Sequence, residues 1–419
     1  MKEPKKILAQ ILFPRRMMKN KIRKVLGLSV LAGMSAAGTA EAQSSEALLK
    51  TLVRKGVITE AEADALRKEA TNNPIDAVPE WVQSISFKGD LRLRYEQAHK
   101  SIDGGNPARN RFRYRFRYGA TADLKNNFKV GFRLASGSTS NPISTNTTMD
   151  DNGQNDTLAI DQAYASWSDG GFTMYGGKMP NHSKTGWFLD NAIIDTDYTP
   201  EGAELHYSWD VGSKSTLGLN YGFWIVDEIK TSSHDAYLNI AQAVFATQLT
   251  DATKAQFGLG TYSVSGSALR NDGSVATGNT IGQGFTPIML DGALSFKTNF
   301  TPVKLFGTWL ENQQAEADNN AWRAGLKLGS AKKAGEWELN YEYRVMEADS
   351  TYDQLSESDF GAINGSSFEG GTNIKGHIIK ARYNIYDNWQ AGLSLYNTEP
   401  ESGSGDSNNR IQLDFVWKF

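Results

Sequence analysis

The sequence predicts an all-β protein, a 16-stranded antiparallel transmembrane β-barrel that follows a short N-terminal α-helical segment. Three observations favour this fold class. From residue 84 onward apolar and polar residues alternate with a period of two, the predicted strands are about ten residues long or longer, and the connections between them alternate in length. The composition agrees, since 40 Gly, 19 Phe, 16 Tyr and 10 Trp at a mean hydropathy of −0.47 suit strands with one apolar and one polar face.

Residues 1–42 are predicted to be a secretory signal peptide. Basic residues precede an apolar stretch at 25–37, and Ala40-Glu41-Ala42 then forms a small-x-small cleavage site. The apolar stretch is too short to span a bilayer as a helix. The true start codon stays open between three residues: Met1, Met17 and Met18.

Charge and cysteine content exclude several classes of protein. The chain has 44 Lys and Arg and 47 Asp and Glu, of which residues 1–42 hold nine and two, so 35 basic and 45 acidic residues remain after cleavage. A net charge of about −10 argues against nucleic acid as a partner. The absence of Cys excludes disulfides, thiolate metal sites and cysteine nucleophiles.

Residues 43–74 are predicted to form a periplasmic helical hairpin or coiled-coil segment, and residues 75–83 a linker. Leu48, Leu49, Leu52 and Val53 have helical spacing, and a capping box from Thr59 to Glu62 begins a second helix. So short a hairpin cannot bury a core alone. Two interpretations stay open: a contact for oligomerisation or with the cell wall, and an arm packed on the periplasmic mouth of the barrel.

The predicted barrel covers residues 84–419. In its last strand, for example, Ile411, Leu413 and Phe415 alternate with Gln412 and Asp414. The sixteen expected strands are 84–97, 109–124, 127–138, 157–168, 171–179, 200–209, 215–226, 236–249, 253–265, 288–299, 303–312, 320–330, 335–346, 373–384, 388–397 and 409–419.

The connections between these strands sort by length. Every second one is a brief turn, such as 125–126 or 169–170, and the others are longer and polar, such as 139–156, 180–199 and 347–372. A barrel inserted from the periplasm has tight turns inside and longer loops outside. An even number of strands then leaves both ends of the barrel on the periplasmic side, and about sixteen strands enclose a lumen too wide for side chains to fill.

The C-terminal segment, Arg410-Ile-Gln-Leu-Asp-Phe-Val-Trp-Lys-Phe419, has alternating apolar residues and a final Phe. With the signal peptide, helices and loop pattern, it resembles the Gram-negative outer-membrane porin superfamily, closest to the family labelled putative porins. The resemblance implies an outer-membrane porin in contact with lipid and lipopolysaccharide, assembled as a homotrimer. It also implies that Phe415, Trp417 and Phe419 belong to the signal read by the barrel-assembly machinery.

The first three strands carry a basic set on one face. The residues that share this face by parity are Lys88, Arg92, Arg94, Arg111, Arg113, Arg115, Arg117, Lys129 and Arg133. Their other face is Phe, Leu, Tyr and Val, and a Lys or Arg facing lipid costs about 2–4 kcal/mol near the midplane. We therefore expect these cations to line an aqueous inner wall, with Asp90 as a local counter-ion.

The opposing charge is expected from the third long loop, 180–199. In trimeric porins this loop folds into the barrel with its acids toward an arginine wall, and by that resemblance Asp190, Asp195 and Asp197 are the constriction-loop acids. One interpretation is a narrow passage with a transverse field that orients solutes. The other is that these charges are solvated above the narrowest point.

The sequence thus predicts passive diffusion of small hydrophilic solutes and ions, with no catalysed reaction, no cofactor and no metal. A substrate-specific channel for phosphate, carboxylates or oligosaccharides stays open as an alternative. A barrel enzyme or adhesin is a further alternative, but the sequence lacks a paired nucleophile and base.

Overall fold

The structure is a computed structural model, and it describes residues 49–50, 52–55, 58–65, 79–100, 108–228, 230, 235–265, 278–280, 282–364, 367–403 and 407–419. The predicted signal peptide lies outside the described residues. By its internal contacts the chain divides into two units, residues 1–86 with 122–126, and residues 87–121 with 127–419.

Among the described residues of the first unit, residues 49–50, 52–54 and 60–65 are helical. The predicted capping box is present at the start of the helix at 60–65. The backbone N–H of Glu62 donates to the Thr59 hydroxyl oxygen at 3.2 Å, and the backbone N–H of Thr59 donates to the Glu62 carboxylate at 2.8 Å. Among the described residues, no helix has the length and apolar character needed to cross a membrane.

The second unit is dominated by strands that follow one another in antiparallel pairs. The sixteen that make one continuous wall are β1 (Val82–Lys100), β2 (Ala108–Leu124), β3 (Phe128–Ser136), β5 (Leu158–Asp169), β6 (Phe172–Lys178), β7 (Glu201–Val211), β8 (Ser215–Asp227), β9 (Ala236–Thr250), β10 (Thr253–Val264), β11 (Pro287–Phe296), β12 (Val303–Asn312), β13 (Asn320–Gly329), β14 (Trp337–Met346), β17 (Ile374–Tyr386), β18 (Trp389–Pro400) and β19 (Asn408–Lys418).

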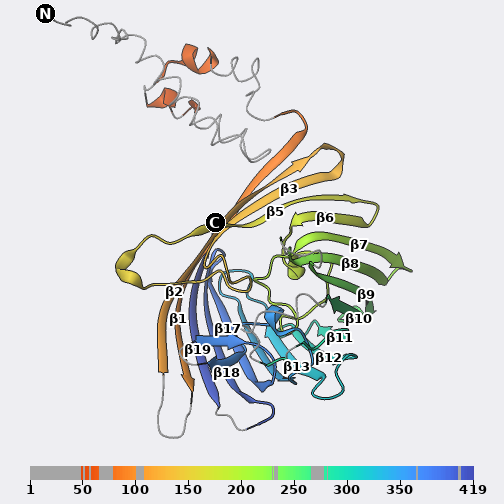
Figure 1. The fold of residues 1–419 in the computed structure, drawn as a ribbon. Helices are drawn as coiled ribbons and strands as arrows, with labels where there is room; N and C mark the ends of the chain where they lie inside the picture. The colour runs from red at the N-terminus through yellow and green to blue at the C-terminus, as the bar shows by residue number, and fades with distance from the viewer. Residues whose placement is uncertain are drawn as a thin grey trace, which may run out of the picture. The chain divides into compact units, whose positions relative to one another are not determined.

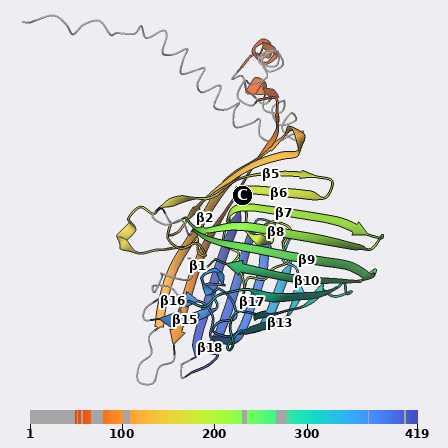
Figure 2. The same ribbon diagram turned by 45° about the vertical axis from the view of Figure 1, so that its right-hand side comes forward.

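Pairing between the first and last strands closes this wall. β1 pairs antiparallel with β19 in a continuous register from Asp90 opposite Lys418 to Lys100 opposite Asn408. A closed sheet has no free edge, so its backbone polar groups are paired within the wall. Figures 1 and 2 show the strands curving around a common interior. The predicted fold class, a closed 16-stranded antiparallel barrel, is confirmed.

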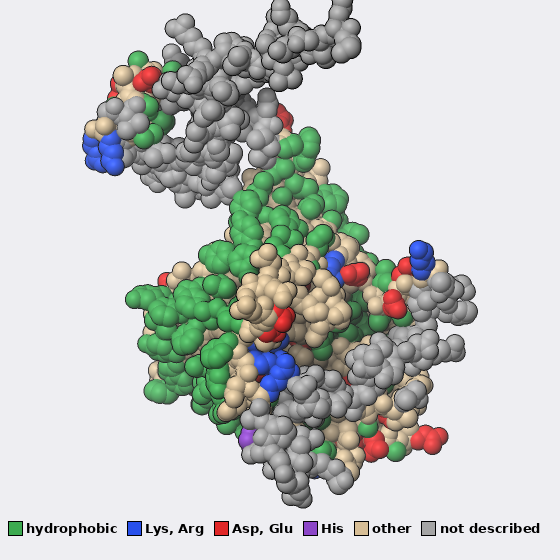
Figure 3. Space-filling view, turned by 60° about the vertical axis from the view of Figure 1, so that its left-hand side comes forward, with side chains coloured by type: hydrophobic (Ala, Val, Ile, Leu, Met, Phe, Trp, Pro, Cys, Tyr) green, Lys and Arg blue, Asp and Glu red, His purple; other side chains and the backbone are tan. Residues whose placement is uncertain are grey.

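The two faces of the wall differ as the alternation predicts. In β8, Leu219 and Tyr221 are exposed on the outside, while Asn220 and Trp224 are buried on the inside. Hydrophobic side chains gather over the outer wall in Figure 3. An apolar exterior of this kind is the face that a transmembrane barrel presents to lipid.

Short turns join alternate strands, and their backbone needs left-handed conformations. Asn126 and Asn127, between β2 and β3, have φ of 62° and 66°, and Gly170 and Gly171, between β5 and β6, have 54° and 87°. Asn and Gly tolerate positive φ better than other residues. At Gly171 a Cβ atom would also lie 2.3 Å from the carbonyl oxygen of Ser208, so a side chain is excluded there on two grounds.

The long loops contain structure that the sequence pattern did not predict. The additional elements are β4 (Thr147–Thr148), the hairpin β15 (Gly361–Asn364) and β16 (Ser367–Gly370), and the 3-10 turns η1 (Lys125–Asn127), η2 (Asp151–Gly153), η3 (His182–Lys184) and η4 (Asp353–Leu355). β4 pairs with β2, so part of the 137–157 loop folds back on the wall. Such two- to four-residue strands are too short to show a period of two.

The apolar core lies inside the barrel and is formed by long loops together with inward-facing strand residues. Ile193 and Ile194, from the connection between β6 and β7, pack in one cluster with inward residues of β8 and β9 such as Trp224 and Ile240. Leu355, from the loop between β14 and β17, belongs to the same cluster. Two long loops therefore enter the barrel, and each is held by apolar packing against the inner wall.

Candidate functional site: the charged interior of the barrel

The loop at 180–199 crosses the interior of the barrel. On one side, Gln242 of β9 bonds both backbone groups of Phe188, accepting from its N–H at 2.8 Å and donating to its carbonyl at 2.6 Å. Asn220 of β8 donates to the carbonyl of Gly186 at 2.9 Å. On the opposite side, Asp197 reaches β2. Because these partners lie on inner faces of separated strands, the loop spans the lumen.

Strands β1, β2 and β3 carry the basic set, and alternation turns it inward. Arg115 and Arg117 of β2 both bond Asp90 of β1, at 2.8 Å each. The same two guanidinium groups approach Asp197 of the loop, at 3.7 Å and 3.5 Å. The structure thus brings together two of the predicted cations, the predicted local counter-ion and one of the predicted loop acids.

Asp197 is held ionised by this arrangement. Burial alone would raise its pKa, but the positive charges of Arg115 and Arg117 outweigh burial and hold the pKa below its ordinary value. A carboxylate close to two guanidinium groups sets up a field across the lumen between the loop and the β2 wall.

Arg111 and Arg113, nearer the long-loop end of β2, share a different partner. Both pair with Glu96 of β1, Arg113 at 3.7 Å, and Gln412 of β19 donates to the same carboxylate at 3.0 Å. The sequence prediction missed Glu96. Glu96 is separated from Asp90 and Arg94 by an even number of residues along β1. The alternation of the sequence therefore already indicates that it lies on the inner face.

Besides Glu96 of its own strand, at 3.9 Å, Arg94 has two acidic partners from other parts of the chain. It forms a bidentate pair with Asp414 of β19, at 2.7 and 2.8 Å, and its Nη1 lies 3.5 Å from Asp359 in the loop between β14 and β17. Arg410 of β19 also pairs with Asp359, at 2.7 Å. A loop carboxylate thus sits between arginines of the first and last strands.

Of the remaining predicted cations, Lys88 of β1 and Lys129 of β3 lie toward the turn end of their strands, and Arg133 lies farther along β3. Arg133 of β3 pairs with Asp161 on the neighbouring β5. Lys88 and Lys129 are exposed. Both share the inward parity of the arginines.

The other two predicted loop acids have different surroundings from Asp197. Asp190 pairs with Arg323 of β13 at 2.7 Å and lies 3.9 Å from Arg344 of β14, on the far side from β1–β3. Asp195 accepts a hydrogen bond from the backbone N–H of Ser358 at 3.0 Å. Burial, and next the nearby Asp197 carboxylate, raise the pKa of Asp195 well above its ordinary value.

A second inward loop, residues 347–372, was not predicted as part of the site. Its Glu357 pairs with Arg344 of β14 and Lys380 of β17, at 2.9 Å each. Burial opposes ionisation of Glu357, but the charges of Lys380 and Arg344 prevail and lower its pKa to about 2. The signal in the sequence was weak, a pair of acids between Leu355 and Phe360 in an otherwise small and polar loop.

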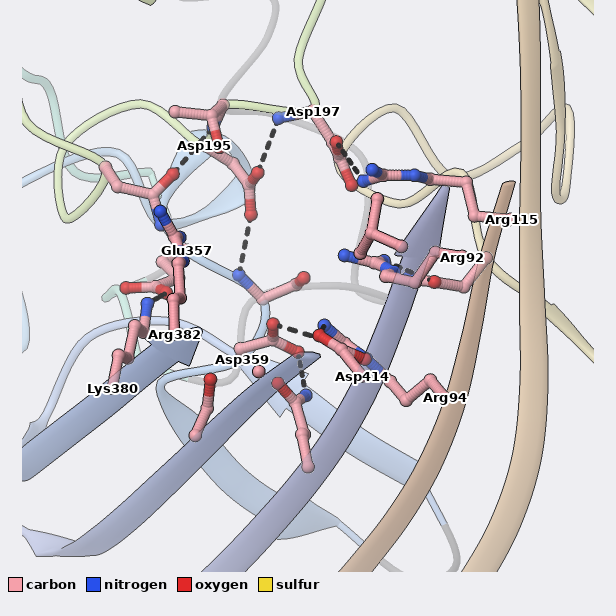
Figure 4. A pocket seen from close by; sticks show the side chains of 18 of the residues that line it. Arg92, Arg94, Arg115, Asp195, Asp197, Glu357, Asp359, Lys380, Arg382 and Asp414 are labelled. Carbon is pink, nitrogen blue, oxygen red and sulfur yellow. Dashed lines mark hydrogen bonds and ion pairs between the residues drawn. The ribbon is translucent and has the colours of Figure 1, made fainter. Parts of the chain in front are cut away.

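Between the loops and the wall of β1, β2 and β17–β19 lies a cavity of about 480 Å³. Figure 4 shows Arg92, Arg94 and Arg115 on one side of it, with Asp197 and Asp359 reaching in from the loops. Among the described residues, no group of three or more His, Asp and Glu side chains is placed to hold a metal ion.

The predicted assembly residues lie on the outer face of the closing strand. Trp417 stacks on Trp389 of β18 with ring centroids 5.6 Å apart. Phe419 exchanges two backbone hydrogen bonds with Gly89 of β1, at 2.7 and 3.1 Å. The role of Phe415, Trp417 and Phe419 as a signal for the assembly machinery stays a prediction.

Comparison with known proteins identifies the family of this barrel. A sequence profile for the family described as "Putative porin" matches residues 102–280 and 277–419. The chain belongs to this porin family. The predicted resemblance is therefore confirmed, and the fold is that of an outer-membrane channel rather than of an enzyme. No functionally curated protein matches the sequence.

Solved structures of porins share the fold of this porin. OprB of Pseudomonas putida, in a high-pH structure, aligns with a TM-score of 0.53 at 12% identity, covering 84% of this chain and 96% of that one. OmpF of Salmonella typhi, in a complex with daunomycin, aligns with a TM-score of 0.50 at 9% identity, covering 82% and 99%. At these identities the likeness concerns the fold alone.

Proposed function

We propose that this porin forms a water-filled channel for passive diffusion of small hydrophilic solutes and ions, and that it catalyses no reaction. In this proposal the inner wall of the first strands faces the acidic loop 180–199 across the narrowest passage. The observation that carries it is the approach of Asp197 to Arg115 and Arg117 inside the barrel.

The charge arrangement supports a transverse field rather than a uniformly charged pore. Cations of β2 stand on one side and the ionised Asp197 on the other, and Asp190 repeats the pattern against Arg323 and Arg344 of β13 and β14. Fixed charges of both signs in a narrow lumen orient dipolar solutes. The local electrostatic potential that they create sets the ion preference.

The experiment is a conductance measurement on the purified, detergent-refolded mature protein in planar bilayers. A diffusion channel gives ohmic single-channel steps whose size rises with salt concentration. In a KCl gradient, the double variant Arg115→Gln with Arg117→Gln should shift the reversal potential toward cation preference. A protein that folds and inserts but passes no current would contradict the proposal.

Further parts of the proposal concern partners and export. We propose a homotrimer in the outer membrane, in contact with lipid and lipopolysaccharide, exported through the signal peptide at 1–42. Support comes from the exposed apolar outer wall and from membership of the porin family. Cross-linking of the membrane-embedded protein tests the trimer, and N-terminal sequencing of the mature chain tests cleavage after Ala42.

A further inference from the structure

The 480 Å³ cavity between the two inward loops and the wall has an excess of positive charge. Nine basic side chains line it, against five carboxylates. Its volume lies in the range of small-molecule sites, about 300–1,000 Å³. The cavity therefore has room for an organic molecule and not only for a bare ion.

Arg92 of β1 differs from the other arginines that line the cavity, all of which form ion pairs. Within the described part of the chain, no carboxylate comes within 4.0 Å of its guanidinium group. Its Nη2 donates to the side-chain oxygen of Asn146, in the loop between β3 and β5, while its Nε is buried without a hydrogen-bond partner. A buried, unpaired N–H of a charged group is costly unless a ligand or water completes it.

The neighbours of Arg92 do not share this condition. Arg94 has a bidentate partner in Asp414, and Arg115 has Asp90 and Asp197. Arg92 stands between these two arginines, as Figure 4 shows, and their charges add to its own. An incoming oxyanion thus meets one guanidinium that has no ion pair within the described part of the chain, and two whose charges are already partly neutralised.

Within the described part of the chain, the loop acids form no ion pair with Arg92 and have closer partners of their own. Asp197 is engaged by Arg115 and Arg117, and Asp195 is turned to the backbone of Ser358. Because burial raises the pKa of Asp195, that carboxyl contributes less negative charge than its type suggests. Asn181, Ser183 and Lys184 of the loop also line the cavity and add neutral and charged donors.

We propose that this cavity is a binding site for the carboxylate or phosphate group of a small organic anion, and that Arg92 is the residue that receives it. The inference rests on the proposed channel function and narrows its substrate class. A guanidinium offers parallel N–H donors that match the two oxygens of a carboxylate or phosphate, which an ammonium does not. Such a site would hold the solute briefly on its way through the lumen.

The test is block of the KCl current by three probes in planar bilayers: succinate, glucose 1-phosphate and glucose. Succinate and glucose 1-phosphate separate the two anionic groups, and glucose is the neutral match of the latter. We expect saturable block by one or both anions and none by glucose at the same concentration. The anion with the lower half-blocking concentration identifies the preferred group.

Variants at Arg92 then locate the site. Arg92→Gln should raise the half-blocking concentration about tenfold or more, as expected for loss of a charge-assisted hydrogen-bond pair. Arg92→Lys keeps the charge without the planar fork and should fall between wild type and Arg92→Gln. The matched control is Lys327→Gln, on the inner face of β13, where Glu338 already neutralises the lysine at 2.7 Å. This control should leave block within about twofold of wild type.

Several results would overturn the inference. These are block by glucose as strong as by glucose 1-phosphate, equal block of wild type and Arg92→Gln, or an equal loss in Lys327→Gln. If Arg92→Gln does not refold, Arg92→Lys alone decides, since unchanged block in that variant excludes a role for the planar fork. Absence of any channel current would instead contradict the proposed function, so the two failures are distinguishable.

Discussion

The carboxylate of Asp195 accepts a hydrogen bond from the backbone N–H of Ser358 at 3.0 Å, and this bond joins the two loops that enter the barrel. The backbone N–H of Asp195 in turn donates to the carbonyl of Leu355 at 2.6 Å. Both contacts involve the same short segment of the 347–372 loop. The two loops are therefore coupled, and a substitution that loosens one loop should also loosen the other.

Removing the Asp195 side chain should loosen the second loop. We expect Asp195→Ala to expose Tyr352 and Phe360, which are 4% and 1% exposed, to chymotrypsin added to the folded protein. Cleavage in this loop should be at least about tenfold faster than in wild type, because local opening governs access of the protease. The matched control is Asp169→Ala, at the end of β5. Equal cleavage of wild type and Asp195→Ala would show that the loops are not coupled.

The contact between the loops should also depend on pH. Burial raises the pKa of Asp195 well above 3.8 and the pKa of Asp353, in the same second loop, to about 6. A carboxyl whose pKa is raised in the folded state favours the folded contact at low pH, and this advantage is lost as pH rises through the raised pKa. Current fluctuations from loop opening should therefore increase from pH 4 to pH 8.

The variant that checks this assignment is Asp195→Asn, which keeps the size of the side chain and cannot ionise. Its fluctuations should depend less on pH than those of wild type, with Asp353 supplying the remaining change near pH 6. A wild-type channel that becomes quieter as pH rises would contradict the sign of the prediction.

Ion selectivity should respond to Asp197 in the direction opposite to the arginines. Asp197→Asn leaves Arg115 and Arg117 with Asp90 alone, so the local potential becomes more positive. We expect the chloride-to-potassium permeability ratio to rise about two- to fivefold at low salt and to change less at 1 M, where screening is strong. Reversal potentials in KCl gradients measure it. Asp169→Asn serves as the control. A shift of ion selectivity toward potassium in Asp197→Asn would contradict the proposed transverse field.

The inner face of the strands could be predicted because alternation with a period of two assigns a side to every residue. Parity alone predicts that Arg94, Arg115 and Arg117 share one face, and the same rule assigns Glu96 to that face. The short turns could be located too, since Asn and Gly mark positions such as Asn126 and Gly170 where φ is positive.

The partners supplied by loops could not be predicted in the same way. A loop has no periodicity that relates sequence position to direction, so nothing in the sequence distinguishes Asp197, which meets β2, from Asp190, which meets β13 and β14. The 347–372 loop enters the barrel through packing of Leu355 and Phe360 in a core made by distant strands. Which strands lie opposite one another is set by closure of the barrel.

Packing of the first inward loop should depend on Trp187. Its ring meets Trp224 of β8 edge-on with centroids 6.1 Å apart and His206 of β7 at 5.5 Å. Trp187→Ala should destabilise the loop by about 3–5 kcal/mol while the barrel wall still closes. The expected signature is faster proteolysis within 180–199 with an unchanged heat-modifiable shift on gels. The control is Trp337→Ala, which removes a 40% exposed indole from the outer wall.

Phe419 and Gly89 meet where the barrel closes, and substitutions at these two residues should have non-additive effects on the stability of the barrel. A Cβ atom at Gly89 would lie 2.4 Å from the ring of Phe419 and 2.9 Å from the carbonyl oxygen of Arg117. Gly89→Ala should therefore destabilise the folded barrel by about 1–3 kcal/mol, as overpacking does. In the Phe419→Ala background the ring is absent but the Arg117 carbonyl remains. Gly89→Ala should then lower the free energy of unfolding by a smaller amount that is still above zero. Refolding yield and thermal stability of the four proteins in the cycle measure the coupling, and additive effects would contradict contact between the two residues.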